Sequence, residues 1–333
     1  MLGVAPGEVI FTSGGTESNN TAIKGSLAKR GGGLLTSVLE HEAILTQVKG
    51  LERAGYNAKL LPPNELGKIV PDAVESSLAE ELSIVSLMHA NNEIGTMTDV
   101  AAIGALCDKH GVVFHTDAVQ TAGWYDWSSL IEQVDLLSIS AHKFYGPKGV
   151  GCLVATRNAE IEGLIEGGSQ ERKRRGGTEN VAGIVGMAKA FELALNERED
   201  RLQLLKDLQS RLIEGIQSTL PTDSYLFNTP LASEDRAPHI VNLSFPPIED
   251  EPIDGEMLIL NLDVEGVLVS SGSACTSGAI EPSHVLLGLG HDQATASAAV
   301  RFSLGKENTV EDVEYAVEKL GKIVGRMREH SNA

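Results

Sequence analysis

Two stretches decide the fold: VVFHTDAVQ at residues 112–120 and LLSISAHKFYGPKGVG at residues 136–151. Each begins with a β-rich apolar run, and polar side chains follow each run at once. Asp117 follows the first run, and Lys143 follows the second. Strands that alternate with helices form a largely parallel sheet, and ligands of such sheets gather at the carboxyl ends of the strands. The sequence therefore predicts that Asp117 and Lys143 lie at one edge of a parallel sheet.

Similar runs recur through the first two-thirds of the chain. Strands are predicted at Val9–Thr12, Ile84–Met88, Val112–Thr116, Leu136–Ser140 and Cys152–Ala155. A helix is predicted to open in the glycine pair before Thr16 and to run to about Ala28. This alternation indicates an α/β fold with a mostly parallel central sheet and crossover helices.

The last third of the chain has the pattern of a smaller α+β domain. Leucines and isoleucines recur at helical spacing over residues 205–220. A strand-like stretch follows at Ile240–Phe245, and the last helix is predicted to begin with a capping box at Thr309. We therefore expect a large domain at residues 1–195 and a small domain at residues 196–333.

Composition bounds the class of protein. Of the 333 residues, 42% are hydrophobic and 22% are charged, which is ordinary for a globular protein. The net charge of −19 argues against direct DNA binding. Cys107, Cys152 and Cys275 are far apart, which argues against disulfides or a metal site and favours a cytoplasmic location. The sequence has no apolar stretch long enough to span a bilayer, so we expect no membrane association.

The stretch FTSGGTESNN, residues 11–20, has two interpretations. A strand followed by a glycine pair and a helix start gathers free backbone N–H groups at one point, which suits a phosphate. Alternatively, the stretch is a tight turn in which Thr16 only caps the helix. The stretch by itself does not decide between them.

Asp117 and Lys143 together suggest a particular cofactor. A carboxylate for the ring nitrogen and an amine able to form a Schiff base are two requirements of a pyridoxal 5'-phosphate site. Taken singly, Asp117 reads as a helix cap and Lys143 as a solvated loop lysine. Taken with the phosphate cradle, the cofactor interpretation is favoured.

A set of eight motifs resembles the cysteine desulfurases. In chain order these are FTSGGTESNN, EHEA, MHANNEIG, FHTDAVQ, SAHKFYGPKGVG, RRGGTEN, SSGSACTSG and VRFSLG. The cysteine desulfurases are pyridoxal-phosphate enzymes of the class V aminotransferase-like group, and the cysteine-containing motif resembles the iron–sulfur-cluster and nitrogen-fixation type. The resemblance implies a fold-type I transferase with a smaller C-terminal domain.

The resemblance also implies roles for individual residues. Lys143 corresponds to the Schiff-base lysine, Asp117 to the partner of the ring nitrogen, and His41 to the histidine stacked on the ring. The positions that bind the phosphate are implied to be Gly15, Thr16, Ser140 and His142. Asn92 and Gln120 are implied to lie near the ring substituents. Thr178 would contact the phosphate of the neighbouring subunit, and Arg301 would bind the substrate carboxylate. A homodimer with shared active sites follows from the role of Thr178.

Cys275 is the residue that makes the resemblance specific to the cysteine desulfurases rather than to aminotransferases of the same fold. It lies among serines, glycines and a threonine, a composition typical of a pliant polar loop and poor as core. The implied reaction converts L-cysteine to L-alanine and leaves the sulfur on Cys275 as a persulfide. The implied acceptors are iron–sulfur scaffold proteins, with transient cluster ligation by Cys275, and pathways that thiolate cofactors or tRNA. Cys107 and Cys152 fall on an apolar helix and an apolar strand, and we expect them to be inert.

Alternatives remain at this point. An aminotransferase of the same fold needs no cysteine at position 275, whereas a selenocysteine lyase differs only in the substrate's chalcogen. A non-catalytic remnant is favoured by the start of the chain, because family members usually begin with a further segment that contains an Asp-Asn-Ala-Ala-Thr-like motif. It is disfavoured by the presence of Lys143, Asp117, His41, Cys275 and Arg301. Without that segment we expect weaker cofactor retention or poor catalysis. A dehydrogenase is disfavoured, because no G-x-G-x-x-G follows a predicted strand.

Overall fold

The structure is a computed structural model of the chain, and it describes residues 2–78, 81–156, 159–272 and 282–331. The chain divides into two compact units. The first unit comprises Met1–Pro63, Ile69–Asn91 and Thr98–Arg198, and the second comprises Asn64–Lys68, Asn92–Met97 and Glu199–Ala333. Each unit has its own apolar core.

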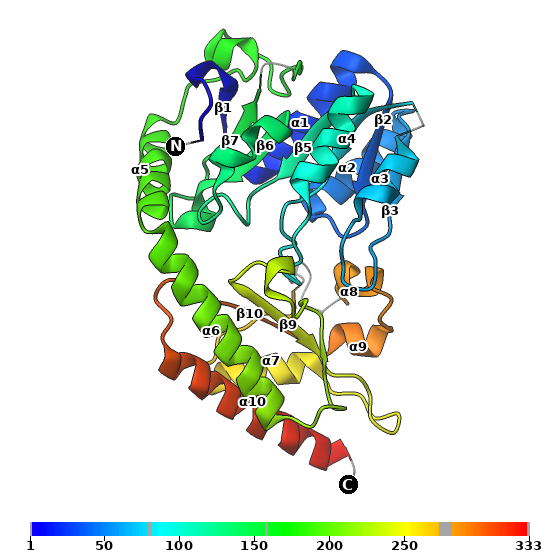
Figure 1. Ribbon diagram of the computed structural model, residues 1–333, viewed down its shortest axis with the longest axis vertical. Coiled ribbons are helices and arrows are strands. Elements are labelled where there is room, and N and C mark those ends of the chain that lie inside the picture. The colour runs from blue at the N-terminus through cyan, green and yellow to red at the C-terminus, as the bar shows by residue number, and fades with distance from the viewer. Residues whose placement is uncertain (1, 79–80, 157–158, 273–281, 332–333) are drawn as a thin grey trace. The chain divides into compact units, whose positions relative to one another are not determined.

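A seven-stranded sheet forms the centre of the first unit (Figure 1). Its strands are β1 (Val9–Thr12), β2 (Gly33–Ser37), β3 (Ala58–Leu61), β4 (Leu82–Ser86), β5 (Val113–Asp117), β6 (Leu136–Ser140) and β7 (Gly151–Ala155). Their order in the sheet is β1-β7-β6-β5-β4-β2-β3. Strands β3, β2, β4, β5 and β6 pair in parallel, and β7 pairs antiparallel with both β6 and β1.

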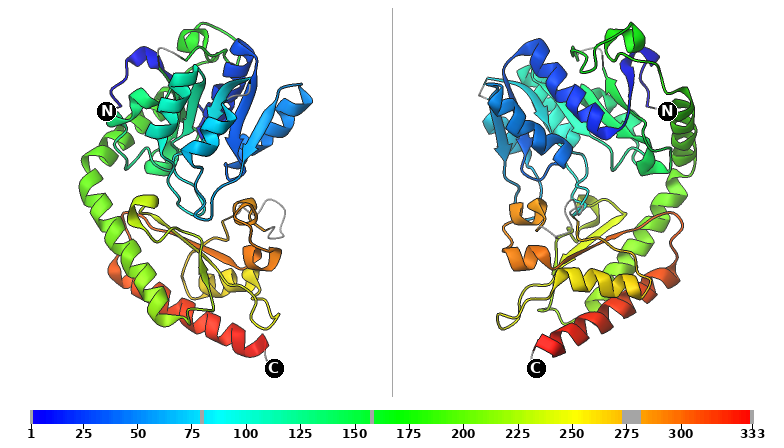
Figure 2. Two further views of the ribbon diagram at one scale, coloured as in Figure 1. Left: turned by 45° about the vertical axis from the view of Figure 1, so that its right-hand side comes forward. Right: turned by 180° about the vertical axis from the view of Figure 1, so that it is seen from behind.

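Helices cover both faces of this sheet (Figure 1 and Figure 2). They are α1 (Gly15–Arg30), α2 (Glu42–Arg53), α3 (Pro71–Ser77), α4 (Val100–His110) and α5 (Val181–Asn196). Short 3₁₀ turns lie at Pro6–Glu8, Trp127–Ser129, Ile131–Gln133, Ala141–Phe144 (η4) and Gln170–Lys173.

Side-chain alternation along the strands explains the two covered faces. Val113 belongs to the apolar cluster that contains α1 and α2, whereas Phe114 belongs to the cluster that contains α3, α4 and α5. In the same way, Leu136 belongs to the cluster of α1 and α2, and Leu137 belongs to the cluster of α3, α4 and α5. Successive side chains of a strand point to opposite faces, so a nearly continuous apolar run is the pattern of a parallel strand buried on both sides.

The second unit is built on a three-stranded antiparallel sheet of order β10-β9-β8. Its elements are α6 (Arg198–Thr219), β8 (Leu226–Phe227), a 3₁₀ turn at Ser233–Asp235, β9 (Ile240–Ser244), α7 (Gly255–Val264), α8 (His284–Gly288), α9 (Gln293–Ser297), β10 (Ala299–Ser303) and α10 (Val310–Ser331). The sheet packs against α6, α7 and α10 through a single apolar cluster.

Several sequence predictions can be checked directly. The predicted strands Val9–Thr12 and Leu136–Ser140 match β1 and β6, and the capping box at Thr309 forms, with reciprocal bonds to Asp312 of 3.0 and 3.2 Å. The strand predicted at Ile84–Met88 is displaced, because β4 covers Leu82–Ser86. No helix in the described ranges combines the length and the apolarity needed to cross a membrane.

Candidate active site

The chain topology brings the ends of three strands to one edge of the sheet. β5 and β6 are parallel neighbours, and β1 runs in the same direction as β6 because both pair antiparallel with β7. The carboxyl ends of β1, β5 and β6 therefore share an edge with the start of β7. The polar residues that follow these strands gather there, as the sequence predicts for Asp117 and Lys143.

Asp117 ends β5 and is buried. Its Oδ2 accepts a hydrogen bond of 2.6 Å from Asn19 Nδ2, and its Oδ1 accepts one of 2.9 Å from the Val119 amide. Burial raises the pKa of the carboxyl group, and the two hydrogen bonds and the electrostatic effects of His41 and Lys143 oppose that rise. A buried carboxylate in this state would gain most from a cationic partner placed directly against it.

The start of α1 and the start of β7 approach each other closely. The N-cap of α1 is Gly14, which supplies no side-chain cap, so Thr16 does not cap the helix. A Cβ on Gly15 would lie 2.7 Å from Val119 Cγ2, and one on Gly151 would lie 2.8 Å from Gly14 Cα. The glycines therefore permit a backbone approach that any side chain would obstruct.

Ser140 and His142 stand beside this glycine turn. An added Cβ on Gly14 would lie 3.7 Å from Ser140 Oγ, and that oxygen lies 3.0 Å from His142 Nδ1. Burial and the charges of Lys143 and Lys148 lower the pKa of His142, so the ring is neutral at pH 7. Lys143 lies on η4, directly after β6, and is exposed.

His41 precedes α2 and caps it. Its Nδ1 accepts a hydrogen bond of 3.0 Å from the Ala43 amide. A ring nitrogen that accepts a hydrogen bond carries no proton, so the neutral ring has its proton on Nε2. The cap therefore fixes the tautomer, and the exposed His41 ring presents an N–H donor on its other side.

Thr178 lies in a segment that an ion pair attaches to α1. Arg175 Nε lies 3.0 Å from Glu17 Oε1, and the pKa of Glu17 is lowered because the bonds from Arg175 and Ser13 outweigh the effect of burial. Thr178 is exposed and helps to line a small cavity of about 100 Å³. Gln120, which follows Asp117 by three residues, is half-buried.

Asn92 and Arg301 lie in the second unit, where they are bonded to each other. Arg301, in the middle of β10, donates from Nη1 to the Asn92 carbonyl oxygen at 2.9 Å. Burial lowers the pKa of the guanidinium group, and the charge of Glu93 opposes that effect. Cys275 lies outside the described residues, so its predicted role has no structural counterpart here.

Two residues at the first unit's site were missed by sequence reasoning. Asn19 falls within the FTSGGTESNN motif, one helical turn after Gly15, and that spacing was the available signal. Glu40 is buried, and its Oε1 accepts a hydrogen bond of 2.9 Å from the Met88 amide. Burial raises the pKa of Glu40 well above its ordinary value. No local pattern reveals a contact between residues that are 48 positions apart.

Cys107 and Cys152 are both buried. Burial raises the pKa of Cys107, in α4, and of Cys152, in β7, to about 12 in each case. A thiol with such a pKa is almost entirely protonated at pH 7, and the thiolate is the reactive form.

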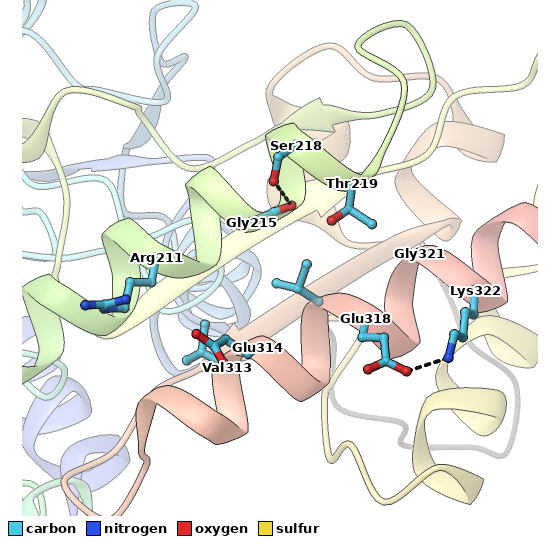
Figure 3. A pocket seen from close by; sticks show the side chains of 10 residues that line it. Arg211, Gly215, Ser218, Thr219, Val313, Glu314, Glu318, Gly321 and Lys322 are labelled. Atoms are coloured by element: carbon cyan, nitrogen blue, oxygen red, sulfur yellow. Dashed lines mark hydrogen bonds and ion pairs between the residues drawn. The ribbon is translucent and has the colours of Figure 1, made fainter.

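A larger groove in the second unit has a different character. It has a volume of about 530 Å³ and lies between α6 and α10, and Figure 3 shows that Arg211 and Ser218 line one side and Glu318 and Lys322 the other. Glu318 and Lys322 pair with each other at 2.5 Å. None of the predicted site residues lines this groove.

The residues of the first unit fit pyridoxal phosphate. Asp117 is a buried carboxyl group suited to a protonated ring nitrogen, and Lys143 is an exposed amine that follows the adjacent strand. The glycine turn at Gly14 and Gly15, with Ser140 beside it, offers a helix start and a hydroxyl as donors for a phosphate. Each chemical part of the cofactor therefore has a matching group at this edge of the sheet.

Comparisons with known proteins agree with this fit. The family model described as aminotransferase class-V matches residues 1–316. The chain is 44% identical over 333 residues to a "Cysteine desulfurase IscS" of Clostridium botulinum (strain Hall), covering 99% of this chain and 82% of that one. A solved "NifS-like protein" superposes with a TM-score of 0.86 and 36% identity, covering 98% of this chain and 84% of the other. A structure of "SspA in complex with cysteine" gives a TM-score of 0.74 and 33% identity over 91% of this chain and 83% of the other.

Proposed function

Because the chain belongs to the cysteine desulfurases of the class-V aminotransferase family, we propose that it uses pyridoxal 5'-phosphate to convert L-cysteine to L-alanine. The sulfur goes to Cys275 as a persulfide. The observation that carries the proposal is the placement of two groups at the carboxyl ends of adjacent strands. Asp117 is a buried carboxylate at the end of β5, and Lys143 is an exposed amine just after β6.

The first unit supplies most of the residues that would hold the cofactor. Asp117, held by Asn19 and the Val119 amide, would bind the protonated ring nitrogen. Thr16 and the backbone N–H groups at the start of α1, with Gly15, Ser140 and His142, would bind the phosphate. His41 would stack on the ring, and Gln120 and Asn92 would bind ring substituents. When bound, pyridoxal phosphate withdraws electrons from the substrate's Cα.

Proton movement would depend on Lys143 and His41. Lys143 would carry the cofactor, and its amine would take the proton from the substrate's Cα. The His41 ring presents a donor at Nε2, because Nδ1 is engaged by the Ala43 amide. That donor suits a hydrogen bond to the substrate sulfur or a proton delivered near it.

Arg301 and Cys275 would handle the substrate in the second unit. The Arg301 guanidinium would bind the substrate carboxylate, a contact that fixes orientation when it is bidentate. The Cys275 thiolate would attack the substrate sulfur, so an S–S bond forms as the Cβ–S bond breaks. The carbon skeleton then takes up protons and leaves as alanine. The "SspA in complex with cysteine" relative supports cysteine as the substrate.

The proposal extends to organisation and partners. Residues 1–195 would form the cofactor domain, and residues 196–333 the domain that carries Cys275. Thr178 would reach the phosphate of a second subunit, which requires a homodimer. An iron–sulfur scaffold protein, or a pathway that thiolates cofactors or tRNA, would take the sulfur. A cytoplasmic location would keep the Cys275 thiol reduced.

An absorbance spectrum tests the proposal directly. The purified chain with added pyridoxal phosphate should show a cofactor band that changes when L-cysteine is added, and alanine should form as sulfide is released under reductant. Lys143→Ala should lose the covalently bound cofactor. Cys275→Ser should keep the cofactor band and form no persulfide. Control variant Cys107→Ser changes a buried, inert thiol and should leave persulfide formation intact.

The outcomes separate the competing functions. A chain that binds no added cofactor would be a non-catalytic member of the family. Persulfide formation in Cys275→Ser would exclude Cys275 as the sulfur acceptor. A much higher kcat/KM for selenocysteine than for cysteine would identify the chain as a selenocysteine lyase.

A further inference from the structure

Glu93 is a buried carboxylate for which the proposed reaction has so far given no role. It lies in the segment Asn92–Met97, which belongs to the second unit, and its side chain is only 3% exposed. Its backbone is anchored to β9, because its carbonyl oxygen accepts a hydrogen bond of 3.1 Å from Asn242 Nδ2. Buried charged groups in proteins are paired or hydrogen-bonded, so the contacts of Glu93 indicate its role.

The first of these partners is Ser283. Its hydroxyl donates to Glu93 Oε2 at 2.5 Å, and Ser283 is itself buried. The same Ser283 oxygen accepts the amides of Val285 and Leu286 at 3.1 and 3.3 Å and so caps α8. Glu93 therefore fixes the orientation of a hydroxyl that also begins a helix.

The second contact is with Gly272. Gly272 has φ +96°, and a Cβ there would lie 2.5 Å from Glu93 Oε2, so its backbone lies directly against the carboxylate. The Gly272 amide donates to Ser270 Oγ at 3.2 Å. Ser270 in turn pairs with the backbone of Arg301, by bonds of 3.2 and 2.6 Å. Gly272 and Ser283 stand on the two sides of residues 273–281.

The third contact is electrostatic and reaches Arg301. The charge of Glu93 favours the protonated guanidinium of this half-buried arginine. Arg301 also donates to the carbonyl oxygen of Asn92, the residue next to Glu93. One carboxylate thus contacts both flanks of the segment 273–281, and its charge acts on the proposed substrate clamp.

We propose that Glu93 is a positioning residue for sulfur transfer: its carboxylate holds Gly272 and Ser283, the described flanks of the segment that contains Cys275, and keeps the Arg301 clamp in place. This inference rests on the proposed function. Contacts that hold Gly272 and Ser283 in one arrangement favour a defined approach of the thiolate to the substrate sulfur. Glu93 itself touches neither substrate nor cofactor in this scheme.

Substitutions can separate the two effects of Glu93. Ser283→Ala keeps the charge beside Arg301 and removes one flank contact, so the single-turnover rate of persulfide formation should fall roughly tenfold with little change in KM for L-cysteine. Ser283→Thr keeps the hydroxyl and should restore the rate. Glu93→Gln keeps an acceptor for Ser283 but loses the charge, so KM should rise several-fold, about what one weakened ionic contact is worth. Glu93→Ala should show both defects.

A second readout does not depend on catalysis. Limited proteolysis of the full chain, with cleavage sites mapped by mass spectrometry, measures how often residues 270–283 become accessible. Glu93→Ala and Ser283→Ala should raise the initial cleavage rate in this range roughly tenfold. Glu256→Gln, an exposed carboxylate on α7 in the same unit, should match the parent in every assay.

The results decide between the inference and the proposed function. A parent chain that forms no persulfide would refute the proposed function, and proteolysis would still test the flanks. The inference would be overturned if Glu93→Ala and Ser283→Ala form the persulfide, and are cleaved in residues 270–283, at rates within twofold of those of the parent. Loss of cofactor uptake in both Glu93 variants would overturn it too, because the role of Glu93 would then be general to the fold.

Discussion

At the scale of single residues, Asp117 shows how burial prepares a charge for a ligand. The carboxylate lies away from water, and its described hydrogen-bond donors, Asn19 and the Val119 amide, are neutral. Burial raises its pKa for this reason. A protonated ring nitrogen would replace the missing solvation and hold the aspartate ionised.

Asp117→Asn should therefore bind the cofactor and fail in catalysis. An amide cannot stabilise a protonated ring nitrogen, so alanine formation at saturating L-cysteine should fall by about 100-fold or more. Asp108→Asn removes an exposed carboxylate from the end of α4 and should keep parental activity. Equal activity of Asp117→Asn and the parent would mean that another group serves the ring nitrogen.

His41 combines a structural and a chemical role, and one substitution separates them. Asparagine is a good helix N-cap, so His41→Asn should keep α2 and leave the thermal midpoint nearly unchanged. The ring and its Nε2 donor are lost, so turnover should fall by about 100-fold, as when a general acid is removed. Alanine release and a thermal melt check this together. If the melting midpoint of His41→Asn drops strongly while turnover stays normal, the role of His41 is structural and not chemical.

At the scale of the elements, β5 carries a histidine that links it to both neighbouring strands. His115 lies 2.8 Å from Ser86 Oγ of β4 through Nδ1 and 2.9 Å from Ser138 Oγ of β6 through Nε2. The ring is completely buried, and burial lowers its pKa to about 3. The folded chain therefore keeps His115 neutral, whereas the unfolded chain protonates it near pH 6.5.

The stability of the fold should consequently fall in acid. Below pH 6.5 the unfolded state binds a proton at His115 that the folded state refuses, so the free energy of unfolding decreases as pH falls toward 3. Between pH 7 and pH 5 this amounts to about 2 kcal/mol. His115→Gln should lose that part of the pH dependence in urea titrations, and His110→Gln, an exposed histidine of α4, should retain it. Parallel pH profiles for the parent and His115→Gln would contradict the prediction.

The elements also show what the sequence could and could not predict. β5 and β6 were predictable because apolar residues on both faces of a strand leave a continuous run. β4 was placed two residues late, because the apolar run continues through Leu87 and Met88 after the strand has ended. The Met88 amide donates to Glu40. Glu40 and Asn19 acquire their meaning only through partners distant in sequence, Met88 and Asp117, and no local pattern records such contacts.

At the scale of the whole molecule, the exposed face of α5 is a surface on which the proposed homodimer can be tested. Val181 and Val185 are 67% and 63% exposed and lie one helical turn apart, and Leu193 is 44% exposed. Neighbouring exposed apolar side chains on one helix are typical of an interface between chains. A second copy of this chain would cover them, which agrees with the shared sites expected from Thr178. Sedimentation should then report a dimer.

Mixing two inactive variants tests whether the sites are shared. Lys143→Ala and Thr178→Ala should each be impaired in cofactor binding or turnover when pure. In a mixed dimer, one site receives Lys143 from one chain and Thr178 from the other, and is intact, while the second site has neither. Random exchange of subunits in an equal mixture should restore about a quarter of the parental sites. Activity no greater than the average of the two pure variants would mean that each chain builds its own site, and the exposed face of α5 would then serve another partner.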